Sequence, residues 1–301
     1  MGEDNYEVII IGGSYAGLSA ALALGRALRK VLIIDSGLPC NRQTPHSHNF
    51  LTQDGKTPKE ISTIAKQQLE QYQTVKFYNG LAVSGIQKED GFEIICQNGE
   101  KFTAKKLIFA TGVKDKMPEI PGFAECWGIS VIHCPYCHGY EVKGEITGII
   151  ANGNFAAHYA QLINHWTKDL TVFTNGTSTL TPEQEAKIEL HNIQIIEKEI
   201  NYLKHENGLV EQIFFKDKTS MSMKAIYSRP DFEQHCKIPE MLGCELTEQG
   251  FLKVDMFQKT NVPNVFACGD NTSPMRSVAN AVATGSMAGV VVNNLMIEAE
   301  F

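Results

Sequence analysis

The chain has 301 residues, of which 43% are hydrophobic and 20% are charged, a balance typical of a globular protein large enough for two domains. Its net charge of -7 argues against a nucleic-acid-binding surface, and its eight cysteines are too few for a secreted fold held by disulfides. No export signal precedes the first apolar run, and asparagines interrupt the late apolar stretch at 278–297. We therefore expect a cytoplasmic protein with no nucleic-acid or membrane partner.

A strand–turn–helix–strand pattern opens the chain. Residues 6–11 are a short apolar run of the kind found in strands buried on both faces, and 30–35 read as a second such strand. Small and apolar residues at 18–28 predict a closely packed helix between them. The first strand and the helix are joined by Gly12-Gly13-Ser14-Tyr15-Ala16-Gly17, so the pattern predicts a βαβ unit with a phosphate-binding turn.

Three positions of this unit carry the prediction. Gly12 permits the tight turn, and Gly17 lets the helix lie close to the strand. Asp35 ends the second strand about 20 residues further on, where an acid holds the ribose hydroxyls of a dinucleotide. Ser14 stands where the usual fingerprint has its middle glycine, so the match is imperfect.

A polar loop and several short elements follow, up to a domain boundary that we place near Lys114. Residues 40–55 are polar and irregular and predict a loop over a site. His46, His48 and Phe50 would line a pocket there, although such histidines more often lie in solvent. The elements expected before the boundary are a helix at 57–72, short strands at 75–102, and a buried strand at 106–109 that runs into Ala110-Thr111-Gly112.

The stretch Cys134-Pro135-Tyr136-Cys137-His138 predicts a redox-active pair of cysteines. Two cysteines three apart on a turn that opens a helix lie on one side of it, close enough to bond to each other. Pro135 suits the first helical position, so Cys134 would precede it beside exposed amides that favour thiolate over thiol. His138 follows directly and carries a proton to or from a sulfur at neutral pH.

Three other interpretations of this stretch remain open. Cys-x-x-Cys-His also matches the attachment site of c-type haem, which normally follows export. A zinc site would need a second ligand pair, and Cys126 and His133, the only near candidates, are not suitably spaced. Two buried, inert cysteines are the third interpretation. We expect no metal site, and we interpret the remaining cysteines as structural: Cys40, Cys96, Cys126, Cys236, Cys244 and Cys268.

A second βαβ unit with a degraded turn follows the cysteines. Strands are expected at 145–150 and 169–174, with a helix between them. Alanine replaces the first and third glycines of the turn at 151–156, and no acid ends the second strand. A 2′-phosphate would favour arginine there, but the only arginine of this segment is Arg229, at its far end. The unit is expected to have kept its fold and to have lost or changed its nucleotide, so NADPH and NADH are possible but doubtful.

The last part of the chain returns to the first domain and ends in a helix at 278–296. Asp270 lies at the carboxyl end of a predicted strand, where open α/β sheets bind ligands. Arg276 and Ser277 open the final helix, whose amino end could face a ligand that gains negative charge. Before them we expect strands and turns at 193–226, a crossing at 228–230, and strand-like runs at 250–254 and 264–270.

Together these motifs resemble the low-molecular-weight thioredoxin reductase family of flavoproteins over nearly the full chain. The resemblance rests on the first glycine turn with Asp35, on 110–112, on the Cys134/Cys137 pair ahead of the second βαβ unit, and on 260–270. It implies an α/β fold of two Rossmann-like, three-layer ββα domains, one inserted in the other, and a homodimer. The implied division is 1–113 with 245–301 for FAD, and 114–244 for a pyridine-nucleotide-type domain that carries the cysteines.

The resemblance also implies roles for single residues. Cys137 would lie against the flavin of FAD, and Cys134 would attack the substrate disulfide, while one domain rotates against the other. His138 is the expected acid–base group. Contacts with FAD are expected at Gly12, Ser14, Tyr15, Ala16, Gly17, Asp35, Asn49, Thr111, Gly112, Gly269, Asp270, Arg276, Ser277 and Val278.

Three departures separate the chain from the usual thioredoxin reductase. His138 stands where an acid usually follows the second cysteine, and residues 174–176 lack the usual His-Arg-Arg. Ser277 replaces the glutamine that usually follows the arginine before the last helix. The Cys-Pro-Tyr-Cys-His-Gly-Tyr-Glu version is similar to the branch that contains the fungal gliotoxin dithiol oxidases, which close a small-molecule dithiol with FAD and oxygen. The lost arginines resemble family members that use donors other than NADPH.

The sequence thus predicts an FAD-dependent thiol–disulfide oxidoreductase that acts on a thioredoxin-like protein or on a small-molecule dithiol or disulfide. A dithiol oxidase that uses oxygen is one alternative. An FAD-bound redox sensor without turnover and a ferredoxin:NADP-type flavoprotein with incidental cysteines are the others. We expect NADPH to bind no better than NADH, and the direction of electron flow to depend on the potentials of the partners.

Overall fold

The computed structural model describes residues 5–301 and divides the chain into two compact units. Unit 1 comprises the chain up to Arg42, Asn49–Lys114 and Phe232–Phe301, and unit 2 comprises Gln43–His48 and Asp115–Asp231. Residue 1, the predicted start of the first domain, lies outside the described residues. Two details differ from the predicted division: the short stretch at 43–48 groups with unit 2, and the chain returns to unit 1 at 232 instead of 245.

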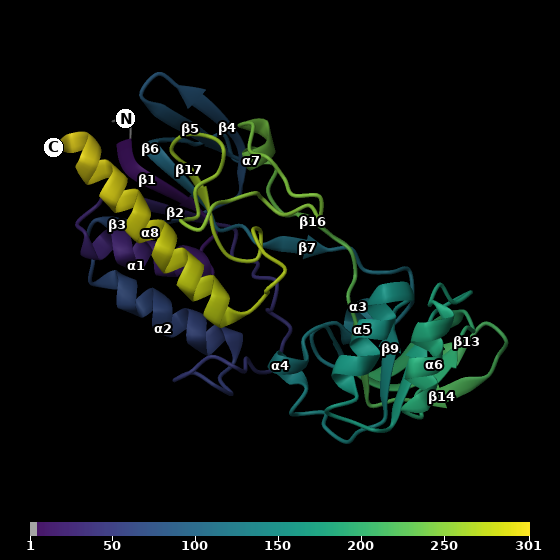
Figure 1. Ribbon diagram of the computed structural model, residues 1–301. Helices are drawn as coiled ribbons and strands as arrows, with labels where there is room; N and C mark the ends of the chain where they lie inside the picture. Colours follow the sequence, from purple (N-terminus) through teal and green to yellow (C-terminus); the bar gives the residue numbers. More distant parts are fainter. Residues whose placement is uncertain (1–4) are drawn as a thin grey trace. The chain divides into compact units, whose positions relative to one another are not determined.

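Unit 1 is built on a seven-stranded sheet (Figure 1). The strands are β1 (Asn5–Ile11), β2 (Val31–Asp35), β3 (Val75–Asn79), β4 (Ala82–Lys88), β5 (Gly91–Cys96), β6 (Lys101–Phe109) and β17 (Val265–Ala267). Their order is β3-β2-β1-β6-β5-β4, with β17 also paired to β6. The pairs among β1, β2, β3, β6 and β17 are parallel, whereas β4, β5 and β6 pair antiparallel. The carboxyl ends of the parallel strands therefore meet at one edge, where ligands bind in such sheets.

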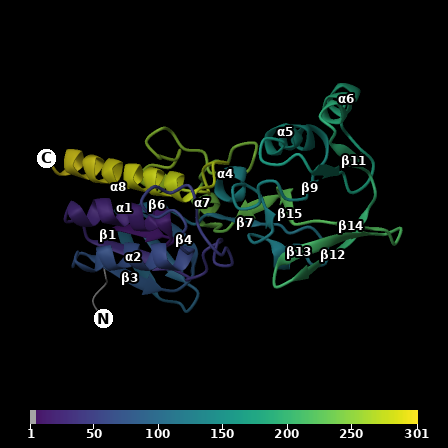
Figure 2. The ribbon, with the colours of Figure 1, turned by 90° about the horizontal axis from the view of Figure 1, so that it is seen from below.

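Helices cover one face of this sheet. They are α1 (Tyr15–Arg26), α2 (Pro58–Glu70) and α8 (Val278–Glu300), and Figures 1 and 2 both show α1 and α8 running side by side. Glycines make this closeness possible, because a Cβ at Gly285 would lie 2.1 Å from the carbonyl oxygen of Ala16, and one at Gly289 would lie 2.6 Å from that of Ala20. The Ala- and Gly-rich composition of the last helix is thus explained by packing. No helix among residues 5–301 is long and apolar enough to cross a membrane.

The strand residues alternate between two cores. Val8 and Ile10 of β1 face the helices, and Ile9 and Ile11 face the opposite side, where residues 236–262 complete a second apolar layer. The short helix α7 (Ile238–Met241) belongs to that layer and packs on β4. This packing explains why the segment before 245 groups with unit 1.

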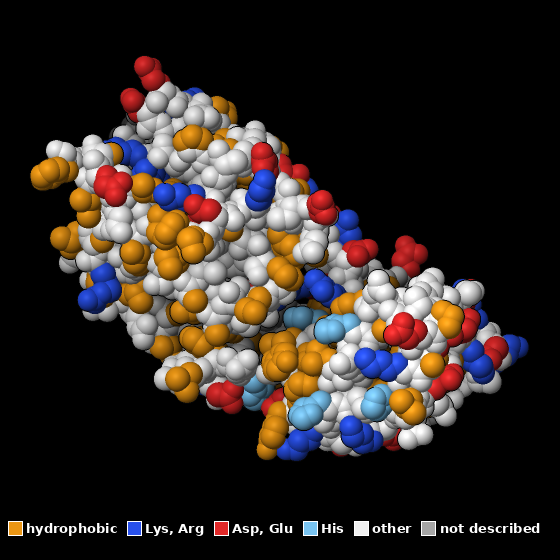
Figure 3. All heavy atoms as spheres, in the orientation of Figure 1, with side chains coloured by type: hydrophobic (Ala, Val, Ile, Leu, Met, Phe, Trp, Pro, Cys, Tyr) orange, Lys and Arg blue, Asp and Glu red, His pale blue; other side chains and the backbone are white. Residues whose placement is uncertain are grey.

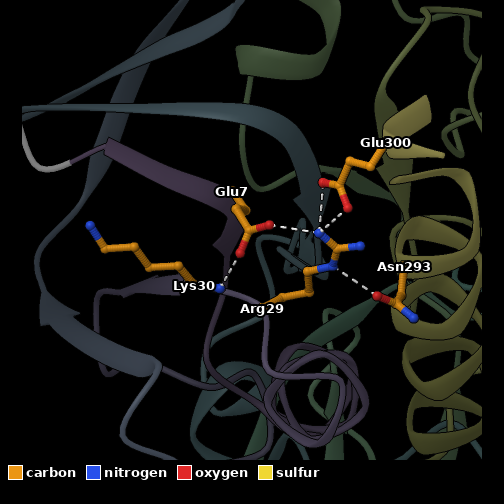
Figure 4. Close-up of polar contacts among 5 residues, drawn as sticks. All are labelled: Glu7, Arg29, Lys30, Asn293 and Glu300. Carbon is orange, nitrogen blue, oxygen red and sulfur yellow. Dashed lines mark hydrogen bonds and ion pairs between the residues drawn. The ribbon is translucent and has the colours of Figure 1, made fainter. Parts of the chain in front are cut away.

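The carboxyl end of α8 is tied to the start of the sheet through a buried guanidinium (Figure 4). Arg29 donates hydrogen bonds to Glu7 at 2.7 Å, to Glu300 at 2.8 and 2.9 Å, and to the side-chain oxygen of Asn293 at 2.8 Å. The second carboxylate oxygen of Glu7 accepts from the backbone N–H of Lys30. Arg29 lowers the pKa of the Glu300 carboxyl by this contact. The network joins both ends of unit 1 to the loop between α1 and β2.

Unit 2 repeats the three-layer plan. Its elements are α3 (Phe123–Cys126), β8 (Val131–Ile132), α4 (Pro135–His138), β9 (Thr147–Ile150), α5 (Gly153–Ile163), β10 (Leu170–Phe173), α6 (Pro182–Leu190), β11 (Gln194–Ile196), β12 (Ile200–Glu206), β13 (Leu209–Phe215), β14 (Ser220–Ser222) and β15 (Ala225–Ser228). A parallel sheet of order β11-β10-β9-β15-β8 carries α5 and α6 on one face and an antiparallel sheet, β12-β13-β14, on the other. Two further strands, β7 (Val113–Asp115) and β16 (Phe232–Gln234), pair with each other.

The predicted fold class, α/β with two Rossmann-like domains, is confirmed. Several element bounds differ from the sequence prediction. Helix α1 begins at Tyr15 instead of residue 18, and α8 continues to Glu300 instead of 296. The predicted strand at 250–254 is wrong: Leu252 forms only an isolated bridge with Leu246, because its N–H bonds to the carbonyl of Asn271 instead of to a neighbouring strand.

Candidate active site

Two thiols lie side by side at the amino end of α4 in unit 2. Cys134 is the residue before this helix and Cys137 its third residue, and the Cys137 thiol donates a hydrogen bond to the Cys134 sulfur over 2.8 Å. Pro135 occupies the first helical position, and the N–H groups of Cys137 and His138 both bond to the carbonyl of Cys134. Both cysteines are partly buried free thiols. A turn of this shape lets the pair alternate between dithiol and disulfide with little backbone movement.

The two sulfurs are not equivalent. The pKa of the Cys134 thiol falls to about 7, chiefly because the Cys137 thiol donates a hydrogen bond to it. Burial opposes this shift, and the backbone N–H groups of Cys137 and Tyr136 add to it. The sequence pointed to the helix amides as the cause, whereas the neighbouring thiol contributes more. Cys134 is therefore the sulfur of the pair that ionises more readily, because the Cys137 thiol stabilises its negative charge.

Histidine and glutamate side chains surround the imidazole next to the pair. The rings of His48 and His138 meet edge to face with centroids 6.5 Å apart, and His48 Nε2 lies 3.5 Å from the Glu141 carboxylate. Burial lowers the pKa of His138 below its ordinary value, a nearby His48 charge lowers it further, and Glu141 raises it. His138 is thus neutral at pH 7, as a group that accepts a proton from a thiol must be. The prediction that His48 more often lies in solvent is wrong, since the 43–48 stretch brings it against this site.

Close packing fixes the orientation of α4. A Cβ at Gly139 would lie 2.4 Å from the carbonyl oxygen of Pro135 and 3.0 Å from Trp166 Nε1. The Tyr136 ring meets Trp166 edge to face at 5.6 Å. No side chain fits at position 139, so the turn that carries both cysteines is seated directly on Trp166, at the end of the α5 segment.

The predicted phosphate-binding turn lies at the end of β1 in unit 1. Gly12 has φ +105°, and its Cβ would lie 2.3 Å from the carbonyl oxygen of Ala110. A Cβ at Gly17 would lie 1.9 Å from the carbonyl oxygen of Gly12, and one at Gly13 would lie 2.8 Å from the Asp35 side chain. Only glycine fits at these positions, which brings bare backbone up to the carboxylate at the end of β2. This cradle fits the adenosine end of FAD.

The amino end of α1 is open to a ligand. Ser14 precedes the helix in an extended conformation, its side chain makes no capping hydrogen bond, and the first turn carries no acidic residue. Helix N–H groups without an intrahelical partner bind phosphate well, and Ala16 belongs to the same first turn. The Tyr15 hydroxyl points elsewhere: it donates to the carbonyl of Pro58 and accepts from Asn41, so it holds the start of α2 and the loop before it.

A second group of predicted FAD residues lies between β17 and α8. Gly269, with φ +87°, donates its N–H to Thr284 of α8, and its Cβ would lie 3.0 Å from that of Ala16. Asp270 lies 3.7 Å from Arg276 Nε. Ser277 caps α8 by accepting the N–H of Asn280 over 3.1 Å, and Val278 is the first helical residue. The two groups of residues thus approach each other where Gly269 meets α1.

The remaining predicted positions lie in tight turns of unit 1. Asn49 has φ +59° and donates its N–H to Asp54, and Gly112 has φ +63° with open space around it. Thr111 is held by Asn271, which the sequence prediction missed. Asn271 is fully buried and its amide donates to the Thr111 hydroxyl at 3.3 Å and to the last carbonyl of β6, while its Oδ1 has no partner among the described residues.

The second βαβ turn, in unit 2, is closed by its own residues. The Asn152 side-chain oxygen accepts hydrogen bonds from the N–H groups of Gly153 and Thr179, both at 2.8 Å, and from the Thr179 hydroxyl at 3.1 Å. Its amide donates to the carbonyl of Thr177. After β10, Asn175 accepts the N–H of Ile200. The side chains that mark a dinucleotide site in unit 1 are replaced here by internal hydrogen bonds.

Other functional candidates could not be read from local patterns. The sequence around Glu141 and His48 does not mark either residue as functional, because only the fold brings their side chains together. Tyr227 is 1% exposed, and its hydroxyl has no hydrogen-bond partner among residues 5–301. Burial raises its pKa, and a negative charge on Cys134 raises it further. Among the cysteines interpreted as structural, Cys40 is exposed and the others are buried. No cluster of His, Cys, Asp and Glu able to hold a metal ion occurs among the described residues.

Comparison with known proteins identifies the family. The family model for pyridine nucleotide-disulphide oxidoreductases matches residues 6–285. The chain is 32% identical to thioredoxin reductase tcpT of Claviceps purpurea, over 97% of this chain and 94% of that protein. It is 33% identical to thioredoxin reductase aclD of Aspergillus oryzae, over 97% of each chain. A putative thioredoxin reductase TrxB from Bacillus anthracis, 30% identical, matches its structure with a TM-score of 0.93 over 98% of this chain and 100% of that one. The chain therefore belongs to the pyridine nucleotide-disulphide oxidoreductase family, as a thioredoxin-reductase-like, FAD-dependent disulfide oxidoreductase.

Proposed function

We propose that the protein passes electrons between FAD and a substrate dithiol or disulfide through Cys134 and Cys137. The observation that carries the proposal is the hydrogen bond from the Cys137 thiol to the Cys134 sulfur, which lowers the pKa of Cys134 to about 7. A thiol with a pKa near ambient pH is the best attacking group in disulfide exchange. Inert structural cysteines would show a raised pKa instead, as Cys126 does at about 11 because of burial.

In the reducing direction, two exchange steps follow from this geometry. The Cys134 thiolate attacks one sulfur of the substrate disulfide, forms a mixed disulfide and releases the first substrate thiolate. Cys137 loses its proton and attacks the Cys134 sulfur, which releases the second substrate thiolate and leaves a Cys134–Cys137 disulfide. Two electrons thus pass from the pair to the substrate, and the reverse sequence closes a substrate dithiol.

The His138 imidazole beside the cysteine pair accepts and donates the protons of the exchange. His138 is neutral at pH 7 because burial lowers its pKa, so it accepts the proton of Cys137 as that sulfur attacks. The imidazolium formed is stabilised by the Glu141 carboxylate and then protonates a leaving substrate thiolate. His48, which contacts both His138 and Glu141, positions these two groups. This arrangement replaces the acid that usually follows the second cysteine in the family it resembles.

The family implies FAD binding, and the cradle of unit 1 is where we propose it binds. When bound, FAD supplies or accepts the two electrons that restore the cysteine pair. Gly12, Gly13 and Gly17 would let the pyrophosphate approach the backbone at the amino end of α1, and Asp35 would hold the ribose hydroxyls. The turn from Gly269 to Val278 would complete the site.

We also propose a second candidate function, in which the protein oxidises a small-molecule dithiol and oxygen is the final acceptor. The closed turn of unit 2 favours this function, because that turn leaves little room for a nicotinamide nucleotide. Asn152 and Thr179 occupy the amino end of α5, where a nicotinamide dinucleotide would place its pyrophosphate. Residues 174–176 offer neither an acid nor an arginine to distinguish a ribose from its 2′-phosphate. We propose that NADPH binds no better than NADH and that both are poor donors.

The partners follow from this chemistry. The relatives named thioredoxin reductase suggest a thioredoxin-like protein as one substrate, and a small-molecule dithiol or disulfide is the other. We also propose a homodimer and a cytoplasmic location, where a cysteine pair of this kind is kept ready for exchange.

An anaerobic titration tests the proposal. The holoenzyme is titrated with NADPH, NADH and dithiothreitol in separate cuvettes, and bleaching of the flavin absorbance is followed. We expect bleaching by the dithiol, and slow or no bleaching by either nucleotide. Rapid bleaching by NADPH would establish a conventional reductase, and bleaching by none of the three would indicate a sensor without turnover.

Cysteine variants supply the control for this titration. Cys134→Ser and Cys137→Ser should abolish bleaching by the dithiol, because the electron path then lacks a sulfur. Cys126→Ser, a change at a buried cysteine of the same unit, should leave it intact. Full dithiol-dependent activity in both active-site variants would refute a role for the pair and favour a flavoprotein with incidental cysteines.

A further inference from the structure

A groove lies beside the cysteine turn and takes no part in the exchange steps proposed for Cys134 and Cys137. It lies within unit 2, has a volume of about 480 Å³, and is lined by Tyr136, His158, Gln161, Leu162, His165 and Trp166. Tyr136 lies between the two reactive cysteines in the chain, so the groove begins within about 7 Å of the Cys134 backbone, measured along two residues. Figure 3 shows histidine and apolar side chains gathered on the part of the chain that carries α4 and α5.

The lining comes from one face of α5 and from the turn it supports. Positions 158, 161 and 162 are spaced i, i+3 and i+4, so they share one side of α5, and His165 lies in the turn that follows this helix. Trp166 closes the groove at one end, with its ring edge to face against both Tyr136 at 5.6 Å and His165 at 5.2 Å. The groove is thus a preformed set of aromatic and apolar surfaces at the edge of the redox turn.

The chemistry of the lining favours a neutral, aromatic occupant. None of the six lining residues is Lys, Arg, Asp or Glu, although 20% of the chain is charged. Tyr136 is 62% exposed, so its ring is accessible to a molecule that enters the groove. Ring edges and faces, together with imidazole and amide groups, bind flat aromatic molecules by stacking and by single hydrogen bonds.

The size of the groove separates a small molecule from a protein partner. A volume of about 480 Å³ lies in the range of roughly 300–1,000 Å³ that small-molecule sites occupy. A stable protein–protein interface buries about 800 Å² on each partner, with roughly 20–30 residues a side. Six lining residues, from α4, α5 and the turn after α5, match the first case.

We infer that this groove holds the body of a neutral aromatic dithiol or disulfide while Cys134 exchanges with its sulfurs. The inference rests on the proposed function and adds the substrate class and the residues that select it. Tyr136 and Leu162 would be specificity-determining residues, whereas the cysteines carry the exchange itself. A thioredoxin-like protein and an aliphatic disulfide become the competing substrates.

Two disulfide probes test the inference on the pre-reduced holoenzyme. One is 4,4′-dithiodipyridine, a neutral aromatic disulfide, and the other is 2-hydroxyethyl disulfide, which is neutral but not aromatic. Cys134 attacks the aromatic probe and releases one pyridinethiol, and Cys137 then releases the second, so two coloured products form for each cysteine pair oxidised. Loss of thiol from the protein follows the second probe. The measured quantity is the ratio of the two second-order rate constants, aromatic over aliphatic.

We expect Tyr136→Ala and Leu162→Gln each to lower this ratio about five- to tenfold, the usual size of one aromatic or apolar contact. Tyr136→Phe should keep most of the ratio, because it retains the ring. Leu190→Ala, a change at an exposed leucine elsewhere in unit 2, is the matched control and should keep the native ratio. Since the ratio cancels any change in thiolate reactivity, a merely structural disturbance of the turn would not lower it.

Three outcomes would overturn the inference. If both rate constants stay at their native values in Tyr136→Ala and Leu162→Gln, the groove does not contact the aromatic probe. An equal fall with both probes would place the effect on the sulfurs instead of on binding. A larger fall with oxidised thioredoxin than with either small disulfide would make the groove a protein-docking surface. If the native, reduced protein exchanges with neither probe, the proposed function itself fails, and this result is distinct from the other three.

Discussion

The two βαβ units of this chain differ most at one point, the amino end of the helix that follows the first strand. In unit 1, Ser14 precedes α1 and its side chain makes no capping hydrogen bond. In unit 2, Asn152 precedes α5 and its side-chain oxygen accepts hydrogen bonds from Gly153 and from both the N–H and the hydroxyl of Thr179. The first helical N–H of α5 is thus bonded to a side chain of unit 2, whereas the Ser14 side chain makes no such bond in unit 1.

The difference supports our proposal that unit 2 keeps a nucleotide-binding fold but binds nicotinamide nucleotides poorly. Helix N–H groups without a partner attract a phosphate, and side chains that satisfy them remove the attraction without altering the helix. Asp35 ends β2 of unit 1, whereas Asn175 follows β10 of unit 2 and bonds inward to Ile200. Unit 2 then serves to carry the cysteine turn, which is seated on Trp166 beside α5.

The largest expected effect on flavin binding comes from adding one methyl group to the glycine turn of unit 1. In Gly17→Ala the new Cβ would lie 1.9 Å from the carbonyl oxygen of Gly12, so the phosphate-binding turn must move. We expect this variant to purify with less than about one-tenth of the native flavin, measured as the ratio of flavin to protein absorbance.

Gly153→Ala is the comparison in unit 2, because Gly153 is the glycine that remains in that turn. Gly153 has φ +56°, so alanine is strained there and costs about 1 kcal/mol, but its Cβ would meet only the Thr179 hydroxyl at 3.0 Å. The flavin content of this variant should equal that of the native protein. Equal flavin loss in both variants would contradict the proposal that only the turn of unit 1 binds the flavin cofactor.

The second prediction contrasts the thiols of the two units. The pKa of Cys134 in unit 2 is about 7, whereas burial raises that of Cys96 and Cys236 in unit 1 to about 11 and that of Cys268 to about 12. At pH 7 about half of Cys134 is thiolate, compared with about one part in 10⁴ for Cys96, so iodoacetamide should modify Cys134 at least 10³-fold faster. Peptide mass spectrometry after reduction measures both rates.

The pKa of Cys134 also determines the direction in which the rate of its modification changes with pH. The rate at Cys134 should fall about tenfold for each unit below pH 7, because protonation removes the thiolate, and should level off above about pH 8. Cys137→Ser alters the hydrogen-bond donor, since a hydroxyl replaces the thiol, and should move this midpoint. A midpoint that stays near the ordinary thiol value of about 8.5 in the native protein would contradict the proposed thiolate.

Sequence reasoning succeeded where a short pattern determines local structure. The glycine turn, the acid at the end of β2 and the proline that opens α4 each reflect a constraint within a few residues, and each was found where expected. The continuous apolar runs of the buried strands also predicted both βαβ units, and the three-layer domains were implied by the family resemblance. The division of the chain was less exact, because the grouping of residues 232–244 depends on packing of α7 against β4.

The parts of the site that sequence reasoning missed depend on contacts between distant segments. His48 reaches Glu141 across more than ninety positions of the chain, and no local pattern marks either residue as a partner of His138. The sequence placed Asn152 in a degraded glycine turn and gave its side chain no role. In the structure this side chain accepts a hydrogen bond from Thr179 and closes the turn. The signal available was an asparagine at a helix start, which predicts a cap.

A third prediction concerns the residues that follow the second strand of each unit. In Asp35→Ala the ribose hydroxyls lose a charged acceptor, and hydrogen bonds to charged groups contribute about 1.5–3 kcal/mol. We expect FAD to dissociate about 30-fold more readily, measured as the flavin retained after repeated gel filtration at low protein concentration. Asn175→Ala, the corresponding change in unit 2, should retain all of its flavin. A loss in both would argue for general destabilisation instead of a ribose contact.

The smallest expected effect is the opening of the closed turn in unit 2. Asn152→Ala removes a helix cap, which costs about 1 kcal/mol, whereas Asn152→Gly frees the same N–H groups at a cost of only a few tenths. Both tryptophans, Trp127 and Trp166, lie in unit 2, so urea unfolding followed by tryptophan fluorescence reports on this unit. The unfolding midpoint should fall more in the alanine variant than in the glycine variant.

The same two variants separate capping from nucleotide selection. Asn152→Gly restores a second glycine to the turn, so any gain in nucleotide binding should appear there first. We expect the gain, measured as the concentration of each nucleotide that gives half-maximal flavin bleaching, to be equal for NADH and NADPH, because residues 174–176 provide neither an acid for the ribose nor an arginine for the 2′-phosphate. A preference of more than about fivefold for one nucleotide would mean that another side chain of unit 2 distinguishes the ribose hydroxyl from the 2′-phosphate. Arg229 is the first candidate for this side chain.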